Sequence, residues 1–326
     1  MISEAPEYYV QGVIKGDRRI LAKTITLIES SLYTHQEMAG VIVDQLLPYS
    51  GKAVRIGITG VPGVGKSTFI ENFGTMLVKK GRRVAVLAVD PSSKRSGGSV
   101  LADKTRMEKL AVEEHAFIRP SPSGGTLGGV ARKTRETMIA CEAAGFDVMI
   151  VETVGVGQSE TTVASMVDFF LVLMIAGAGD ELQGIKKGIL ELADAVAVNK
   201  ADGDNIEKAE LARQQYENAL HFLTPNSPSW SPPVIACSAL EMTGIDDIWQ
   251  MVLNHREKFV HTGELEQKRS RQALDWMWML VEEGLKLRLH KNDEIRKLLP
   301  KLTLAVQNGE TAPTVAASKL LLLMDR

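Results

Sequence analysis

The stretch from Gly60 to Ser67 constrains this chain more than any other, because it has the G-x-x-x-x-G-K-S spacing of a phosphate-binding loop. A mostly apolar run precedes it and a helix-compatible segment follows, so the motif lies in the strand–loop–helix setting that it requires. Glycines let successive backbone N–H groups point at phosphates, and the helix N-terminus adds partial positive charge. We expect these residues to contact phosphate: Gly60, Val61, Pro62, Gly63, Val64, Gly65, Lys66, Ser67 and Thr68.

Within this loop, Lys66 is expected to reach the β- and γ-phosphates, and the Ser67 hydroxyl to bind Mg²⁺. The alternative is a glycine-rich turn that holds no ligand.

Composition excludes several other classes of protein. The chain has 326 residues, of which 44% are hydrophobic and 24% charged, as in ordinary globular proteins. Its net charge of -2 gives no overall basic field that would attract nucleic acid or an anionic membrane. The longest apolar run, Phe169 to Gly179, is far short of the roughly 20 residues that span a bilayer. Two cysteines far apart in sequence argue against a disulfide framework and favour a cytoplasmic location.

Short aliphatic runs alternate with helical patterns and predict an α/β fold with a doubly wound, mainly parallel sheet, because strands buried on both faces are nearly all apolar. We expect residues 1–48 to form an N-terminal helical extension, 49–260 the phosphate-loop domain and 261–326 a C-terminal helical region. Gly16-Asp17 and Thr34 are expected to break or cap the first helices, and Pro300 and Asn308-Gly309 the last ones. The predicted strands are Val54–Thr59, Val84–Asp90, Ala116–Arg119, Val148–Glu152, Phe169–Ile175, Ala195–Asn199 and Val234–Ser238.

The N-K-x-D tetrad of residues 199–202 directly follows a predicted strand and favours guanine over adenine. A carboxylate at Asp202 can accept guanine N1–H and N2–H together, whereas adenine offers no such pair of donors. Asn199 would bind the base edge or hold the phosphate loop, while the stem of Lys200 packs along the ring. Backbone N–H groups of Ser238, Ala239 and Leu240 can meet the guanine O6. An ordinary helix cap at Asp202 is the alternative.

Acidic residues near predicted strand ends suggest where Mg²⁺ and the attacking water would lie. Glu152 begins an E-x-x-G arrangement and would hold Mg²⁺ through a water, because this ion keeps several of its waters. Asp90 is expected next to the phosphate loop, where it would orient the attacking water or hold a magnesium-bound water, although a strand-ending turn at Asp90-Pro91 would also explain it. Asp103 is a further candidate, at the end of the glycine- and hydroxyl-rich segment 92–103, which is a candidate first switch. The expected catalytic residues are Lys66, Asp90 and Glu152, and the metal ligands Ser67, Asp90, Asp103 and Glu152.

Three further features complete the pattern. Residues 177–187 combine acid, amide and base after a central strand, which could couple the nucleotide to a partner or simply lead into a helix. The six histidines are scattered, without the pairs that hold a transition metal. The apolar helical region after residue 261 suggests either self-association or packing on the sheet domain.

In order, the segments GVPGVGKST, AVDPSS, DKTRM, ETVGVGQSE, AGDELQGIKKG, NKAD and CSAL resemble those of the methylmalonyl-CoA mutase accessory GTPases, which were historically named kinases of the lysine/arginine/ornithine transport system. The resemblance runs from about Gly16 to Asp247 and continues more weakly through the C-terminal helices.

This resemblance implies a SIMIBI-like G domain that uses GTP and Mg²⁺. It also implies a cytoplasmic homodimer, joined through its C-terminal helices, that acts as chaperone of an adenosylcobalamin-dependent mutase. Such a chaperone gates cofactor loading, protects the mutase, and has a slow GTPase that the mutase stimulates. By motif match, Asp180, Gln183 and Lys186 lie in the loop that relays nucleotide state to the mutase. Lys94 and Ser96 depart from the family's usual proline and threonine, and Ala176 from its frequent proline.

Three other functions fit parts of the sequence. A metallochaperone GTPase would carry a His- or Cys-rich delivery segment, which this sequence lacks. A kinase of an amino-acid transport system would most often prefer ATP, which the N-K-x-D tetrad disfavours. A nucleotide-dependent scaffold with negligible turnover is compatible with the sequence, because slow intrinsic GTPases are common.

Overall fold

The computed structural model describes residues 4–89, 107–120, 127–153, 159–177, 183–223 and 227–324. By its internal contacts the chain divides into two compact units, Met1–Arg269 and Ser270–Arg326. The first unit holds the sheet and the helices around it, and the described part of the second consists of helices and the turns between them.

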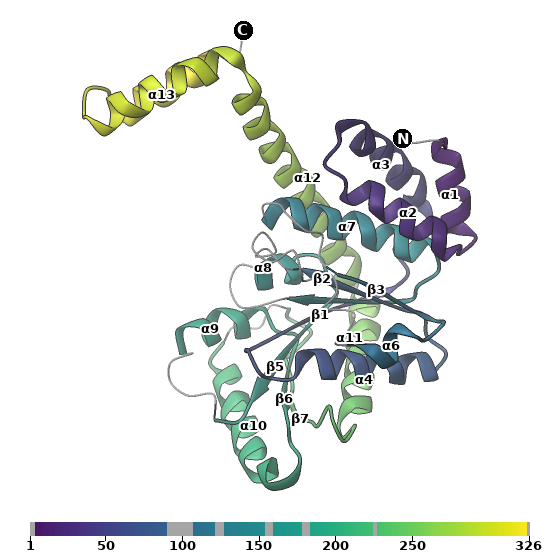
Figure 1. Cartoon of the computed structure of the whole chain (residues 1–326). Coiled ribbons are helices and arrows are strands. Elements are labelled where there is room, and N and C mark those ends of the chain that lie inside the picture. Colours follow the sequence, from purple (N-terminus) through teal and green to yellow (C-terminus); the bar gives the residue numbers. More distant parts are fainter. Residues whose placement is uncertain are drawn as a thin grey trace. The chain divides into compact units, whose positions relative to one another are not determined.

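The first unit is built on a seven-stranded sheet, all of whose neighbouring strands are parallel (Figure 1). Every aliphatic run predicted as a strand forms one. Strands β2, β4 and β6 are buried along their whole length, whereas the two edge strands, β3 and β7, are mostly half-buried. The strands are β1 (Val54–Gly60), β2 (Val84–Val89), β3 (Ala116–Arg119), β4 (Val148–Thr153), β5 (Phe169–Ile175), β6 (Ala195–Asn199) and β7 (Val234–Ala236).

The strand order is β3-β2-β4-β1-β5-β6-β7. β2, which leads to Asp90, is not the neighbour of β1, because β4 lies between them. The carboxylate on the strand beside β1 is therefore Glu152, whose Cα pairs with that of Ile58. Asp90 itself lies outside the described residues.

Helices cover both faces of the sheet: α4, α6 and α11 lie on one side, and α7 and α8 on the other (Figure 1). Their bounds in the first unit are α4 (Lys66–Lys79), α6 (Glu108–Ala111), α7 (Leu127–Ala143), α8 (Ser159–Ala164), α9 (Gln183–Leu192), α10 (Ile206–His221) and α11 (Ile245–Thr262). Among the described helices, none is both long and apolar enough to cross a membrane.

Three N-terminal helices pack on one another and on α7. They are α1 (Pro6–Ile14), α2 (Arg18–Glu29) and α3 (Tyr33–Leu46), followed by a short 3-10 turn at Leu47–Tyr49. Gly16 has φ +75°, and the Asp17 carboxylate accepts hydrogen bonds from the first backbone N–H groups of α2, so the predicted break and cap are confirmed. The cap predicted at Thr34 is wrong, because α3 begins one residue earlier and its N-cap position is Leu32.

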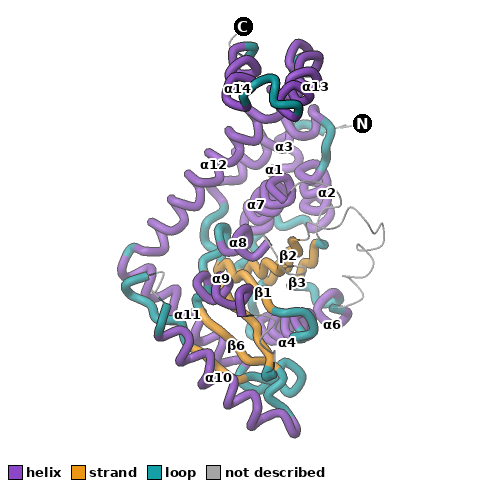
Figure 2. The backbone as a smooth tube through the Cα atoms, turned by 90° about the vertical axis from the view of Figure 1, so that its left-hand side faces the viewer, coloured by secondary structure: helices purple, strands orange, loops and turns teal. Residues whose placement is uncertain are grey.

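The second unit contains most of α12 (Glu264–Lys291), with α13 (Asp293–Gln307) and α14 (Pro313–Leu322). α13 and α14 lie side by side (Figure 2), and the Asn292 amide donates to the Leu323 carbonyl. Pro300 was expected to interrupt a helix, but it lies inside α13; the helix ends at Asn308-Gly309 as predicted. Proline there removes one backbone hydrogen bond without ending the helix.

A buried ionic network fastens the first turns of α12 to the amino ends of the strands. Asp168, just before β5, is 2% exposed and accepts two hydrogen bonds from the Arg269 guanidinium, at 2.8 and 2.7 Å. The backbone N–H of Arg55 donates to the same carboxylate, and the Arg55 side chain pairs with Glu142 at 2.6 Å. Burial alone would raise the pKa of Asp168, but the hydrogen bonds and charge of Arg269, helped by Arg55, hold it below its ordinary value. A chain ending at residue 261 would leave this carboxylate without Arg269.

His255 of α11 lies in the core beside this network. Its ring contacts Phe169, Trp230 and Phe259, and its Nε2 is 3.7 Å from Asp194 Oδ1. Burial lowers the pKa of His255 to about 4, although the charge of Asp194 acts in the opposite direction. The imidazole is therefore neutral at pH 7, and its approach to Asp194 is a contact rather than an ion pair.

The depressed pKa of His255 predicts a loss of stability in mild acid. The unfolded chain binds a proton at this histidine near pH 6.5, whereas the folded chain does so only near pH 4. The free energy of unfolding should therefore fall as pH drops through this window, by roughly 2–3 kcal/mol at pH 4.5. Urea unfolding at pH 7.5 and 4.5 measures this.

In His255→Phe that part of the decline should be absent, whereas His261→Gln, at an exposed histidine of the same helix, should retain it. The same pH dependence in wild type and His255→Phe would contradict the assignment.

Candidate nucleotide-binding site

The phosphate-loop motif has the predicted structure, with β1 ending at Gly60 and α4 beginning at Lys66. Gly63 and Gly65 have φ of +76° and +87°, the left-handed region that side chains disfavour. At Gly60 a Cβ would lie 2.6 Å from the Leu173 carbonyl oxygen on β5, so glycine is required there by close packing. The loop thus leads a buried strand directly into a helix N-terminus.

Lys66 lies near two buried carboxylates. Its Nζ donates to the Gly60 carbonyl at 3.2 Å, within the loop itself. Burial lowers the pKa of Lys66, and the charges of Glu152 and Glu160 oppose that effect. Glu152 lies at the end of β4, and Glu160, 1% exposed, lies on α8. A half-buried ammonium at a helix N-terminus is well placed to bind a phosphate.

The ends of β1 and β4 are joined by a buried hydrogen bond between the hydroxyls of Thr59 and Thr153, 2.8 Å apart. This bond fixes the spacing between the phosphate loop and the residues that follow β4. Sequence reasoning missed both threonines and also Glu160, although Glu160 belongs to the motif ETVGVGQSE.

Asn199, at the end of β6, connects two loops that are far apart in sequence. Its Nδ2 donates to the Val64 carbonyl of the phosphate loop at 2.8 Å, and its Oδ1 accepts from the Ala239 N–H at 2.9 Å. The side chain is 2% exposed. Of the two roles expected for Asn199, the structure places its amide on the phosphate loop.

Asp202 and Ser238 link the N-K-x-D tetrad to the loop that follows β7. The Ser238 hydroxyl donates to Asp202 Oδ2 at 2.5 Å and accepts the N–H of Glu241 at 3.0 Å. Asp202 precedes a 3-10 turn (Gly203–Asn205), but its carboxylate makes no capping hydrogen bond there. The alternative of an ordinary helix cap therefore does not describe this side chain. Lys200 adopts φ +64°, and its carbonyl accepts from the Asn205 amide at 2.6 Å.

All of these residues lie at the carboxyl ends of parallel strands, where ligands bind in open α/β sheets. The site brings together the phosphate loop, the end of β4, the N-K-x-D tetrad and the loop after β7. Asp90, Asp103 and Asp180 lie outside the described residues, as do the loop positions Lys94, Ser96 and residues 154–158. Gln183 and Lys186 are in the first turns of α9, and their side chains are not among those described.

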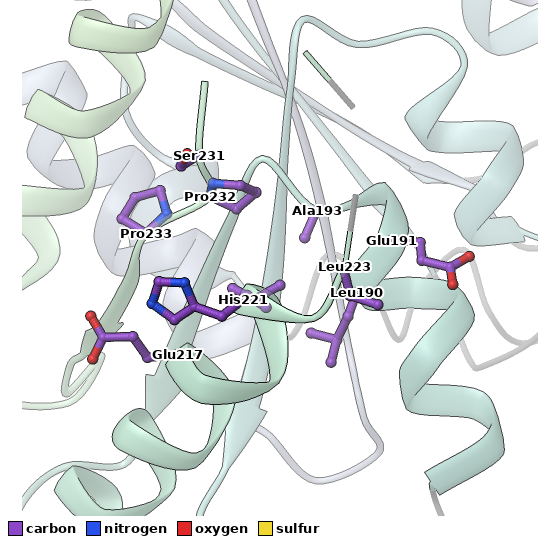
Figure 3. Close-up of a pocket in the computed structure, with 10 residues that line it drawn as sticks. Leu190, Glu191, Ala193, Glu217, His221, Leu223, Ser231, Pro232 and Pro233 are labelled. Atoms are coloured by element: carbon purple, nitrogen blue, oxygen red, sulfur yellow. The ribbon is translucent and has the colours of Figure 1, made fainter. Parts of the chain in front are cut away.

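A cavity of about 370 Å³ lies elsewhere in this unit (Figure 3). Ala193 precedes β6 and Pro233 precedes β7, so the cavity is at the amino ends of these strands rather than at the nucleotide edge. Its lining comes from the ends of α9 and α10 and the segment before β7: Leu190, Glu191, Ala193, Glu217, Leu220, His221, Leu223, Ser231, Pro232 and Pro233. None of these is a predicted nucleotide residue.

Comparison with known proteins gives the same interpretation. Residues 21–294 match the family model described as methylmalonyl Co-A mutase-associated GTPase MeaB. The chain is 48% identical to GTPase ArgK of Escherichia coli, covering 98% of this chain and 97% of that protein. It is 45% identical to the mouse (Mus musculus) protein named methylmalonic aciduria type A homolog, mitochondrial, over 95% of this chain and 77% of that one.

Among solved structures, the chain is similar to one described as LAO/AO transport system kinase. The TM-score is 0.80 and the identity 41%, and the match covers 100% of both chains. With the phosphate loop, the N-K-x-D tetrad and the family model in agreement, this chain belongs to the MeaB family of methylmalonyl-CoA mutase-associated GTPases.

Proposed function

We propose that this GTPase binds an adenosylcobalamin-dependent methylmalonyl-CoA mutase as a chaperone, gates loading of the mutase cofactor and protects the mutase from inactivation. The observation that carries the nucleotide part is the double hydrogen bond of Asn199, which holds the phosphate loop and the Ser238–Leu240 loop as one site. The family model supports the choice of client.

Guanine recognition rests on Asp202. Its carboxylate accepts guanine N1–H and N2–H, and the Ser238 hydroxyl holds one of its oxygens in place. ATP would leave this carboxylate facing no matching donors, which costs binding energy. Lys200 packs its stem along the base.

The phosphates lie in the Gly60–Thr68 loop, with Lys66 at the β- and γ-phosphates. Magnesium fits here because oxygen donors gather at one edge: the Ser67 hydroxyl in the first turn of α4 and the buried Glu152 carboxylate at the end of β4. Asp90 and Asp103 complete this set in the proposal. The bound ion supplies positive charge that offsets the charge of the phosphates.

Hydrolysis then proceeds by attack of a water oxygen on the γ-phosphorus. The bond from that phosphorus to the β–γ bridging oxygen breaks, which yields GDP and inorganic phosphate. Lys66 stabilises the charge on the transferred group, while Asp90 orients the water. In this proposal turnover is slow in the isolated protein and rises when the mutase binds.

The relay to the mutase runs through residues 177–187, with Asp180, Gln183 and Lys186. This segment leads from β5, the strand beside β1, into α9. It therefore begins at the carboxyl ends of the strands, where the nucleotide is proposed to bind. We place the protein in the cytoplasm, which its two free, buried cysteines, Cys141 and Cys237, fit.

The test of this proposal is steady-state hydrolysis of GTP and ATP by the purified chain, with and without methylmalonyl-CoA mutase from the same organism. Slow hydrolysis of GTP alone, at least several-fold faster with the mutase, is the expected result. Lys66→Ala should reduce turnover to background both with and without the mutase. A GTPase rate that does not respond to the mutase would overturn the chaperone part and leave the nucleotide chemistry standing.

We also propose that the chain forms a homodimer through its C-terminal helices. One stripe of α12 in the second unit exposes Leu274, Met277, Trp278, Val281 and Leu285, each between 42% and 60% exposed. An apolar stripe of this kind favours association with a second copy.

The double substitution Val281→Lys with Leu285→Lys should therefore convert a dimer to a monomer in sedimentation velocity, because it places two charges in the apolar stripe. Lys286→Glu, an exposed change away from that stripe, should leave the dimer intact. A dimer that persists in the double variant would place the interface elsewhere.

A further inference from the structure

Asn72 makes a hydrogen bond that none of the nucleotide motifs accounts for. It lies on α4, after the phosphate loop, and its Nδ2 donates to the Ala239 carbonyl at 2.7 Å across 167 residues of sequence. Asparagine is a poor helix former, because its amide competes for backbone hydrogen bonds. Here the amide instead holds the loop that follows β7.

The bond fixes one peptide plane. The Ala239 carbonyl and the Leu240 N–H belong to the same planar, trans peptide, so they point in opposite directions. Holding the carbonyl against α4 therefore turns the Leu240 N–H away from that helix.

The neighbouring amides are engaged elsewhere. The N–H of Ser238 donates to the Thr243 carbonyl, that of Ala239 to Asn199 Oδ1, and that of Glu241 to the Ser238 hydroxyl. Of the amides from 238 to 241, Leu240 is the one to which the described structure assigns no acceptor. The loop itself adjoins Asp202 through Ser238.

We propose that Asn72 is a positioning residue for guanine selectivity, which holds the Ala239–Leu240 peptide with its N–H toward the guanine O6. The inference rests on the proposed binding of guanine by Asp202. O6 is adjacent to N1 on the base, so a base paired with Asp202 presents O6 to this loop. Adenine carries an amino group where guanine carries O6. This amino donor would face the Leu240 N–H, and two opposed donors disfavour the binding of adenine.

Buried aromatic packing surrounds Asn72 on α4. On either side of it along α4, Phe69 and Phe73 are fully buried and stack with ring centroids 5.5 Å apart, and Phe73 also contacts Trp249. The helix that begins with Lys66 therefore supports the phosphate contacts at its N-terminus and the base loop further along.

Calorimetric titration of the full chain with GDP, IDP and ADP tests this role. IDP keeps O6 and N1–H but lacks the 2-amino group, so it reports the O6 contact separately from the second Asp202 contact. In Asn72→Ala, affinity for GDP and IDP should fall by the same factor, about tenfold, while ADP affinity stays within about twofold. Thr75→Ala, which removes a hydroxyl bonded only within α4, should change none of the three.

Asn72→Asp keeps the size of the side chain but turns an oxygen toward the Ala239 carbonyl, so its loss of GDP and IDP affinity should be larger. If thermal unfolding shows that Asn72→Ala does not fold, the affinities of Asn72→Asp are measured instead. Unchanged GDP affinity, or equal losses for GDP, IDP and ADP, would overturn the role of Asn72. A wild-type chain that binds ADP as tightly as GDP would instead refute the proposed guanine site.

Discussion

The two hydrogen bonds of the Asn199 side chain are the interaction on which the site depends. A buried amide must satisfy both its donor and its acceptor, and the Asn199 amide does so by joining the phosphate loop at Val64 to the base loop at Ala239. Neither loop has regular structure of its own to fix its position. One residue at the end of β6 thus links the two halves of the proposed nucleotide site.

The carboxyl ends and the amino ends of the strands differ in what they contribute to the structure. At the carboxyl ends, loops with unusual backbone angles gather polar groups for a ligand. At the amino ends, Asp168 and Arg269 form a buried, doubly hydrogen-bonded pair that fastens the start of α12 to β1 and β5. β5 connects the two ends, because Asp168 lies just before this strand and the segment beginning at Gly177 follows it.

Sequence reasoning recovered what is encoded locally. The strands were predictable because parallel strands buried on both faces must be apolar, and the phosphate loop because its glycines and lysine keep a fixed spacing. It did not recover the place of β4 beside β1, since strand order is a property of the whole sheet. The prediction at Pro300 was wrong for a different reason. Proline usually ends a helix, but α13 continues through this residue in its tertiary context.

The contacts that sequence reasoning missed are those between distant residues of common types. Asp168 and Arg269 are 101 residues apart, and Asn72 and Ala239 are 167 apart. Nothing in the neighbourhood of either residue indicates its partner, because an aspartate before a strand or an asparagine in a helix has many local explanations. Only the fold shows that one helix serves both the phosphate loop and the base loop.

A crystal structure of the chain with a non-hydrolysable GTP analogue and Mg²⁺ would test the central claim most directly. The account predicts the triphosphate along the backbone N–H groups of Gly60–Thr68, with Ser67 on the metal and the guanine edge on the Asp202 carboxylate. The Asn199 bond to Val64 should remain. A base bound away from Asp202, or a nucleotide that leaves the phosphate loop empty, would contradict it.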